Sequence, residues 1–299
     1  MVSGQVASEG LMLQRCRNCG SAFLGNPDRT GSSTELYDTG VYAHTGGGRD
    51  RVIEPARRLL GRERVRLLGT LPRGARVIEV GAGRGRLLAA LRDRGHDAVG
   101  IEPSRTASAM ALAGGLPVEA ATLEEADFPV GKADLVVFWH VLEHLDRPRE
   151  ALAKARGWVK GGGRLVVAAP NLASLQARIG GDRWFHQEVP RHLTQFTVTG
   201  LKALLQRSGF QLTNCSHVLI EQNWLGMWLT MLNWMTIDRD VPFRFMKRDL
   251  RYRRRMDALR DALISILVGV PLLPAAALLE VGAGLARRGG TIVVGASPA

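Results

Sequence analysis

Two groups of residues in this chain of 299 residues have types and spacings that could do chemistry. The first is a loop with three glycines, Gly81, Gly83 and Gly85, each separated from the next by one residue. Glycine accepts left-handed backbone angles and lets a ligand approach the main chain closely, so such a loop can cradle a nucleotide-like molecule. Glu79 stands two positions before the first glycine, and Glu102 ends the next apolar run.

The second group contains histidines. His140, Glu143 and His144 are spaced i, i+3 and i+4, so a helical turn would place them on one face. His192 lies further along, in the segment EVPRHLTQFT. Imidazole changes its charge near neutral pH, and each histidine is therefore a candidate general base. The triplet could also bind a divalent metal or simply cap a local helix, and we expect no metal there.

The hydrophobic pattern predicts the elements that position these residues. The continuous apolar run 133–139 is typical of a strand buried on both faces of a parallel sheet. In an open α/β sheet a ligand binds at the carboxyl ends of the strands, where the glycine loop and His140 would both fall. The predicted strands are 77–80, 98–102, 117–120, 133–139, 164–169, 210–220 and 290–295, with helices at 53–71, 84–94, 148–158 and 198–208 and a turn at 161–163.

Taken in order, the glycine loop, Glu102 and the His140 region resemble the class I S-adenosylmethionine-dependent methyltransferases. The dinucleotide fingerprint differs, because it would place a glycine where Arg86 stands. The resemblance covers residues from about 71 to 209 and the C-terminal end. It implies a doubly wound α/β sheet of seven strands with the last strand antiparallel, and S-adenosylmethionine as the cofactor. It also implies cofactor contacts at Glu79, Gly81, Ala82, Gly83, Gly85, Glu102 (ribose), Asp127 and Phe128 (adenine) and His140.

The segment around Pro190, Arg191 and His192 resembles small-molecule members of this family, and the region of His140, Glu143 and His144 is similar to quinone O-methyltransferases, with a histidine in place of their first acid. This resemblance implies methyl transfer to a small or lipid-linked acceptor, at oxygen. His192 would lie on the acceptor side, with His140 and His144 as further candidate catalytic residues. Two alternatives stay open: a membrane-docked module that binds the cofactor without catalysis, and an RNA methyltransferase, which only the net charge of +12 indicates.

The cysteines bear on the expected cellular compartment and on zinc binding. Three cysteines do not make a disulfide framework, and the N-terminus lacks a secretory pattern, so we expect a cytoplasmic protein. Cys16 and Cys19 form half of a zinc knuckle whose second pair is missing, with His44 the nearest further ligand. The pair either holds zinc or is a remnant turn. The predicted divisions are a leader (1–50), a cofactor-binding core (51–220), a helical insertion (221–289) and the final core strand (290–299).

The insertion is both apolar and basic. One lysine and six arginines lie within 247–260, and residues 262–279 carry no charge. Pro271 and Pro274 are expected to divide this run into two helices too short to cross a membrane. We therefore expect 247–279 to lie on the inner face of an anionic membrane, or else to form a cap over the site or a dimer contact. Few aromatic residues interleave with the basic ones, so we do not expect nucleic acid as a partner.

Overall fold

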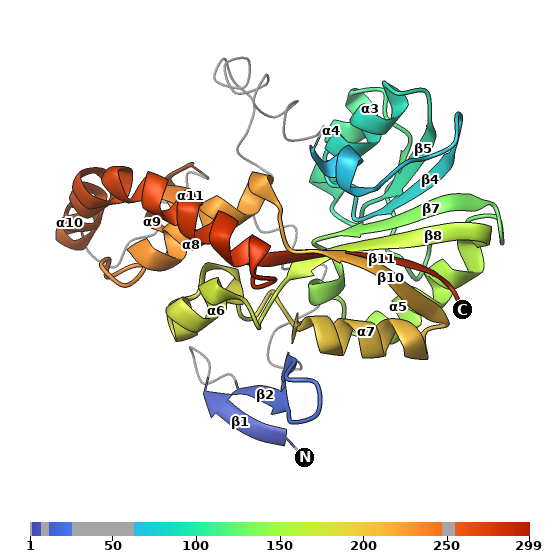
Figure 1. Ribbon diagram of the computed structural model, residues 1–299. Helices are drawn as coiled ribbons and strands as arrows, with labels where there is room; N and C mark the ends of the chain where they lie inside the picture. The colour runs from blue at the N-terminus through green and yellow to red at the C-terminus, as the bar shows by residue number, and fades with distance from the viewer. Residues whose placement is uncertain (1, 7–11, 26–62, 247–254) are drawn as a thin grey trace. The chain divides into compact units, whose positions relative to one another are not determined.

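The computed structural model describes residues 2–6, 12–25, 63–246 and 255–299, and the chain forms two compact units (Figure 1). The first unit comprises Met1–Pro27, Pro170–Thr199 and Ser216–Ile292. The second comprises Asp28–Ala169, Gly200–Cys215 and Val293–Ala299. The domain boundaries expected from the sequence stay a prediction.

The second unit is built on a sheet of seven strands in the order β10-β11-β8-β7-β4-β5-β6. Strands β4 to β8 pair in parallel where they are neighbours, and the last strands are antiparallel. Figure 1 shows α3 and α4 on one face of the sheet, and α5 and α7 on the other. This confirms the predicted doubly wound α/β fold. The bounds are β4 Arg76–Val80, α3 Arg86–Arg92, β5 Asp97–Ile101, α4 Arg105–Ala113, β6 Val118–Glu119, β7 Ala133–Trp139, α5 Pro148–Trp158, β8 Val159–Pro170, α7 Val198–Arg207, β10 Phe210–Ser216 and β11 Thr291–Pro298.

Strand β7 lies at the centre of this sheet and of its core. Leu135, Val136, Val137 and Phe138 are completely buried, as expected for a strand that is covered on both faces. Its neighbours are β4 and β8, so the loops that follow β4 and β7 leave the same edge of the sheet. That edge carries the glycine loop and His140.

Two predictions about strands were wrong. The glycines 161–163 were expected to form a turn, but they lie inside β8. Ala133 pairs with Val159 whereas Leu135 pairs with Arg164, so the glycines form a bulge, and Gly162 adopts a φ of 76°. The strand expected over 210–220 ends at Ser216 because the chain enters α8, which spans Ile220–Leu232.

The apolar run of the insertion also differs from the prediction, because it is not divided at its prolines. α10 (Arg255–Ile264) continues through a π-helical segment (Ser265–Gly269) into α11 (Val270–Leu285). Pro271 lies in the first turn of α11, and the π-helical turn just before it alters the hydrogen-bond ladder that proline would otherwise break. By length and composition alone, the helix Met256–Leu285 is long and apolar enough to cross a membrane.

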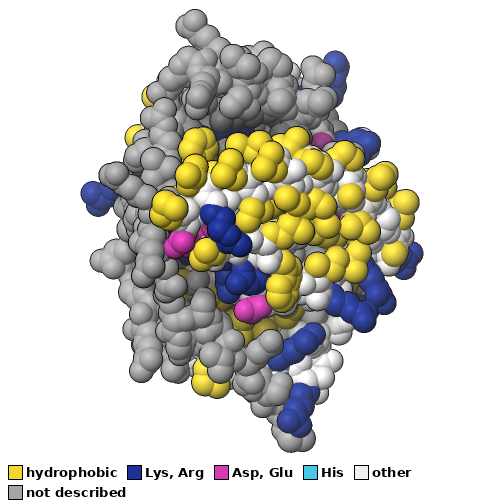
Figure 2. Space-filling model, turned by 90° about the vertical axis from the view of Figure 1, so that its left-hand side faces the viewer, with side chains coloured by type: hydrophobic (Ala, Val, Ile, Leu, Met, Phe, Trp, Pro, Cys, Tyr) yellow, Lys and Arg dark blue, Asp and Glu magenta, His cyan; other side chains and the backbone are white. Residues whose placement is uncertain are grey.

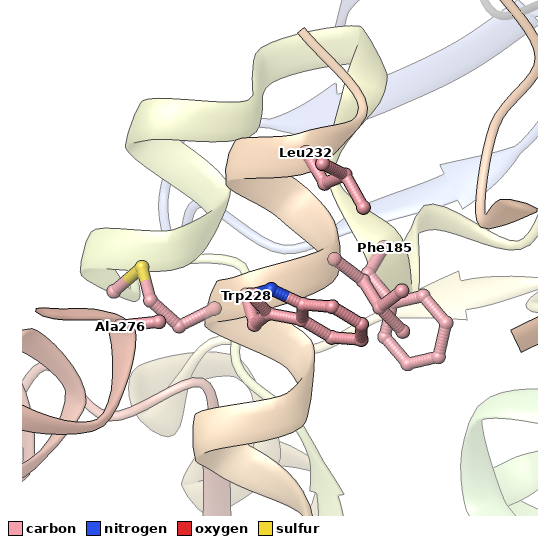
Figure 3. Packing of buried hydrophobic residues seen from close by; sticks show 6 residues of the cluster. Phe185, Trp228, Leu232 and Ala276 are labelled. Atoms are coloured by element: carbon pink, nitrogen blue, oxygen red, sulfur yellow. The ribbon is translucent and has the colours of Figure 1, made fainter. Parts of the chain in front are cut away.

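The first unit combines a small sheet with helices. β1 (Val2–Val6), β2 (Met12–Cys16), β3 (Ala22–Leu24) and β9 (Thr194–Gln195) form an antiparallel sheet. α6 (Leu175–Gly180), α8, α9 (Val241–Met246), α10 and α11 form the helical part. Its core gathers around Trp228 of α8, which Figure 3 shows beside Phe185 and near Ala276 of α11. The Trp228 Nε1–H donates to the Gly269 carbonyl at 2.7 Å, which ties α8 to the long helix.

Parts of two predicted features lie outside the described residues. Of the helix expected at 53–71, residues 63–67 are helical, and 53–62 are not described. The basic segment 247–254 and His44 are likewise outside the described ranges.

Candidate active site

The three glycines of the loop after β4 all have left-handed backbone angles, with φ of 69° at Gly81, 55° at Gly83 and 73° at Gly85. A Cβ atom at Gly81 would lie 2.4 Å from Val141 Cγ2, and one at Gly85 would lie 2.4 Å from Leu116 Cδ1. At Gly83 a Cβ would meet no heavy atom of the described residues within 4 Å. Gly81 and Gly85 therefore allow close packing, whereas Gly83 borders open space that a ligand can enter.

Two further contacts hold the loop against β5. The amides of Gly81 and Ala82 both donate to the Ile101 carbonyl at 2.9 Å. Glu102, which follows β5 and is only 4% exposed, accepts a hydrogen bond from the Gly83 amide at 2.8 Å. Its other oxygen accepts from the Ser104 amide at 2.9 Å. Glu102 thus lies directly beside Gly83, where the ribose contact is expected, although that role stays a prediction.

Glu79 is the second buried carboxyl near the loop and has a different character. Burial raises the pKa of the Glu79 carboxyl to about 8, against the attraction of Arg64 and with added repulsion from Glu102. Within the part of the chain that the structure describes, its Oε2 atom has no hydrogen-bond partner. A protonated acid in this position can ionise when a cationic group approaches it.

Arg64 is a site residue that the sequence analysis did not identify. The Arg64 guanidinium lies 5.4 Å from the centre of the Trp139 ring and acts on Glu79. The available signal was its spacing of i, i+4 from Leu68, which is buried. A cation beside the glycine loop is suited to a carboxylate-bearing ligand.

His140 follows β7 at the same edge as the glycine loop. Its amide donates to the Ala168 carbonyl at 2.9 Å, and its φ of 54° is unusual for a residue other than glycine. Such a backbone costs on the order of 1–3 kcal/mol and persists at functional sites. The ring Nδ1 lies 3.2 Å from Glu143 Oε1, and Glu143 is 1% exposed. Val141 packs on Gly81, so this segment and the glycine loop are neighbours.

The predicted helical turn after β7 is a 3-10 turn over Leu142–His144. His144 is half-buried there, and its amide donates to the Val141 carbonyl at 3.0 Å. The catalytic role predicted for His144 stays a prediction.

The structure places Phe128 in the core and Asp127 at the surface. Phe128 packs edge-on against Trp158, with ring centres 5.2 Å apart, and Asp127 is exposed. Trp158 ends α5 just before β8 begins, whereas the glycine loop follows the end of β4. The adenine contact stays a prediction without geometric support, because an acidic residue followed by an aromatic one is too common a pair to identify a site.

His192 belongs to the first unit and is 4% exposed. Its ring Nδ1 lies 2.7 Å from the His186 carbonyl oxygen, and its amide donates to the Glu188 carbonyl at 3.0 Å. A carbonyl can only accept, so Nδ1 carries the hydrogen and Nε2 is the basic nitrogen of the neutral ring. The loop thereby fixes both the orientation and the tautomer of His192.

Cys16 and Cys19 lie on the turn between β2 and β3. Hydrogen bonds from the Cys19 and Asn18 amides lower the pKa of the Cys16 thiol, as a thiolate ligand would require. Among the residues that the structure describes, no cluster of three metal-ligating side chains includes these two cysteines. The zinc prediction stays open.

Comparison with known proteins identifies the chain. A family profile described as a methyltransferase domain matches residues 52–214, more than half of the sequence. The chain therefore belongs to the methyltransferase family, and it is a class I S-adenosylmethionine-dependent enzyme. The comparison with curated proteins finds no match.

Two solved structures share the fold. The crystal structure of the [4+2]-cyclase SpnF matches with 20% identity and a TM-score of 0.51 over 81% of each chain. A chain of the complex between the Haloferax volcanii Trm112 methyltransferase activator and a protein described as a methyltransferase matches with 16% identity and a TM-score of 0.53. That match covers 89% of this chain and 97% of the other. Both show the fold and not the reaction.

The residues around the glycine loop fit S-adenosylmethionine, the cofactor of this family. Its methionine end carries an ammonium and a carboxylate, and the loop offers the unsatisfied Glu79 oxygen together with the Arg64 guanidinium. The space beside Gly83 allows the ligand to approach the main chain. Bound there, the cofactor supplies an electrophilic methyl group on a sulfonium.

Gly83→Val should weaken binding of S-adenosylmethionine roughly tenfold or more, because valine strains the left-handed backbone and fills the adjacent space. Isothermal titration calorimetry measures the affinity. Gly131→Val is the matched control, since Gly131 also has a positive φ (65°) and open space around its Cβ, but precedes β7. Equal affinities of the two variants would remove Gly83 from the site.

Glu79 should make the cofactor-free protein less stable as pH rises. Its carboxyl ionises at 4.5 in its ordinary state but near 8 when folded, so between these values the unfolded state binds fewer protons. Its stabilising contribution is complete below 4.5 and is lost as pH passes through about 8. Urea unfolding measures the free energy of unfolding at about pH 5 and about pH 9. This free energy should fall less between the two pH values for Glu79→Gln than for the wild type. Glu124→Gln, at an exposed carboxyl, should behave as the wild type.

Proposed function

We propose that this methyltransferase transfers the methyl group to an oxygen of a small or lipid-linked acceptor. One observation carries the proposal: two buried or half-buried histidines, His140 and His192, each have Nδ1 beside an oxygen acceptor. In both rings this arrangement makes Nε2 the nitrogen that takes up a proton. A hydroxyl acceptor must lose a proton during methyl transfer, whereas the sulfonium cofactor needs no such help.

The two histidines have different proposed roles. His140 lies next to the glycine loop through Val141, so we assign it to the cofactor side. The Glu143 carboxylate at Nδ1 orients its ring. His192 is held by the His186 carbonyl, and we assign it to the acceptor side as the general base. His144 remains a further candidate base.

The acceptor class is tested by supplying labelled cofactor. Purified protein is incubated with methyl-labelled S-adenosylmethionine and, separately, a lipid extract, a pool of aqueous small molecules, and total RNA. We expect label in the lipid or small-molecule fraction, and the ¹³C chemical shift of the transferred methyl should be that of a methoxyl group. Label confined to RNA, or a methyl group on nitrogen, would contradict the proposal. If the protein binds the cofactor but transfers no label to any of the three fractions, the result would favour a module that binds the cofactor without catalysis.

His192→Ala should lower the turnover number by roughly 10²–10⁴-fold, the usual contribution of a general base, and leave the affinity for S-adenosylmethionine unchanged. Steady-state kinetics with the acceptor found above and calorimetry with the cofactor provide the two readouts. His96→Ala, at a half-buried histidine just before β5, is the control and should keep full turnover. Unchanged turnover in His192→Ala would exclude it as the base.

A further inference from the structure

The insertion between β10 and β11 exposes a large apolar surface that methyl transfer does not use. Six large hydrophobic side chains define what we call the apolar face: Met256, Leu259, Ile266, Leu267, Leu278 and Leu285. Their exposed fractions lie between 59% and 76%. Figure 2 shows hydrophobic side chains gathered over this side, with Lys and Arg side chains and a few Asp and Glu side chains around them. So much contiguous exposed apolar surface marks an interaction site.

Two of the acidic residues of this long helix, Asp261 and Glu280, are turned into the protein, whereas Asp257 near its start is half-buried. Asp261 is completely buried and accepts hydrogen bonds from the amides of Ile237 and Asp238, at 3.0 Å and 2.8 Å. Glu280 is 4% exposed and accepts from the Gly290 amide at 2.7 Å and from Gln176 Nε2 at 2.8 Å. No charged residue lies between Asp261 and Glu280 in the sequence. The helix therefore presents no negative charge to its surroundings over this length.

Both ends of the long helix are basic. Arg260 is 52% exposed near the first end, where α10 begins at Arg255. Arg287 and Arg288 are exposed directly after the other end. An apolar face between two basic ends complements a bilayer with anionic headgroups. Two copies of the chain pairing through this face would bring like charges together, which disfavours a dimer contact.

A shallow groove lies beside the same face. It has a volume of about 740 Å³ and runs between α6 and α11, with Leu175, Leu278 and Leu279 among its apolar lining residues. Arg288 is its charged lining residue. An acyl chain can lie against such leucines while the guanidinium contacts a phosphate.

The long helix cannot cross a bilayer without losing its packing. Ala276 of α11 is completely buried in the cluster around Trp228, and Trp228 also bonds to Gly269. Glu280 bonds to Gly290, immediately before β11, which joins the sheet beside β10. The chain therefore enters and leaves the insertion at neighbouring strands. These contacts favour a helix that lies in the plane of the membrane surface.

We propose that the apolar face of α10 and α11 docks this protein onto the surface of an anionic lipid bilayer, without spanning it. The leucines and isoleucine enter the boundary of the acyl chains, and the basic ends contact lipid phosphates. This docking is independent of the acceptor proposed above, because it uses none of the residues around the glycine loop.

The test is co-sedimentation of the full chain with vesicles of phosphatidylglycerol and phosphatidylcholine, compared with vesicles of phosphatidylcholine alone. We expect binding to the anionic vesicles that weakens as salt concentration rises. The double variant Leu267→Glu, Leu278→Glu should bind to the anionic vesicles with a bound fraction at least tenfold lower than that of the wild type. The matched control pair, Leu112→Glu with Val130→Glu, charges leucine and valine that are 51% and 77% exposed in the second unit, and should bind as the wild type.

Three results would overturn the proposal. One is sedimentation with phosphatidylcholine vesicles equal to that with the anionic ones. A second is equal loss of binding in the test pair and the control pair. The third is a combined result: the wild type is a dimer in analytical ultracentrifugation and binds neither kind of vesicle, and the Leu267→Glu, Leu278→Glu variant is a monomer. Calorimetry with S-adenosylmethionine on each variant keeps this test separate from the methyl-transfer proposal, since every variant should bind the cofactor normally.

Discussion

The burial of residues 135–138 of β7 is the constraint on which the cofactor half of this protein depends. This apolar stretch needs cover on both faces, so α3 and α4 pack on one side of the sheet and α5 and α7 on the other. Parallel neighbours then send the loops after β4 and β7 to one edge. The glycine loop and His140 are neighbours for this reason, although about 55 residues separate them in the chain.

At that edge two buried glutamates perform different tasks because their surroundings differ. Glu102 has an amide hydrogen at each oxygen, from Gly83 and Ser104, and so fixes the loop to the start of α4. Glu79 has little hydrogen-bond support, and its raised pKa follows from burial. One carboxyl organises the protein, while the other is available to respond to the charge of a ligand.

Local patterns predicted much of this arrangement. The apolar runs predicted β4, β5 and β7 to within a residue at either end. Errors arose where distant contacts decide the structure. The glycines of β8 form a bulge in its pairing with β7, and Pro271 directly follows a π-helical turn at the start of α11. Arg64 could not be identified as a site residue from the sequence, because its partners Trp139 and Glu79 come close to it only in the fold.

The entry and exit of the insertion at adjacent strands has an evolutionary consequence. Because β10 and β11 are neighbours at one side of the sheet, a short hairpin connection could join them, and strands β4 to β8 would keep all their pairings. Exchange of the insertion would therefore leave the strand pairings of the sheet intact. Natural variation or engineering could replace residues 220–285 to give the enzyme a new location or partner, while the half that binds the methyl donor is inherited unchanged.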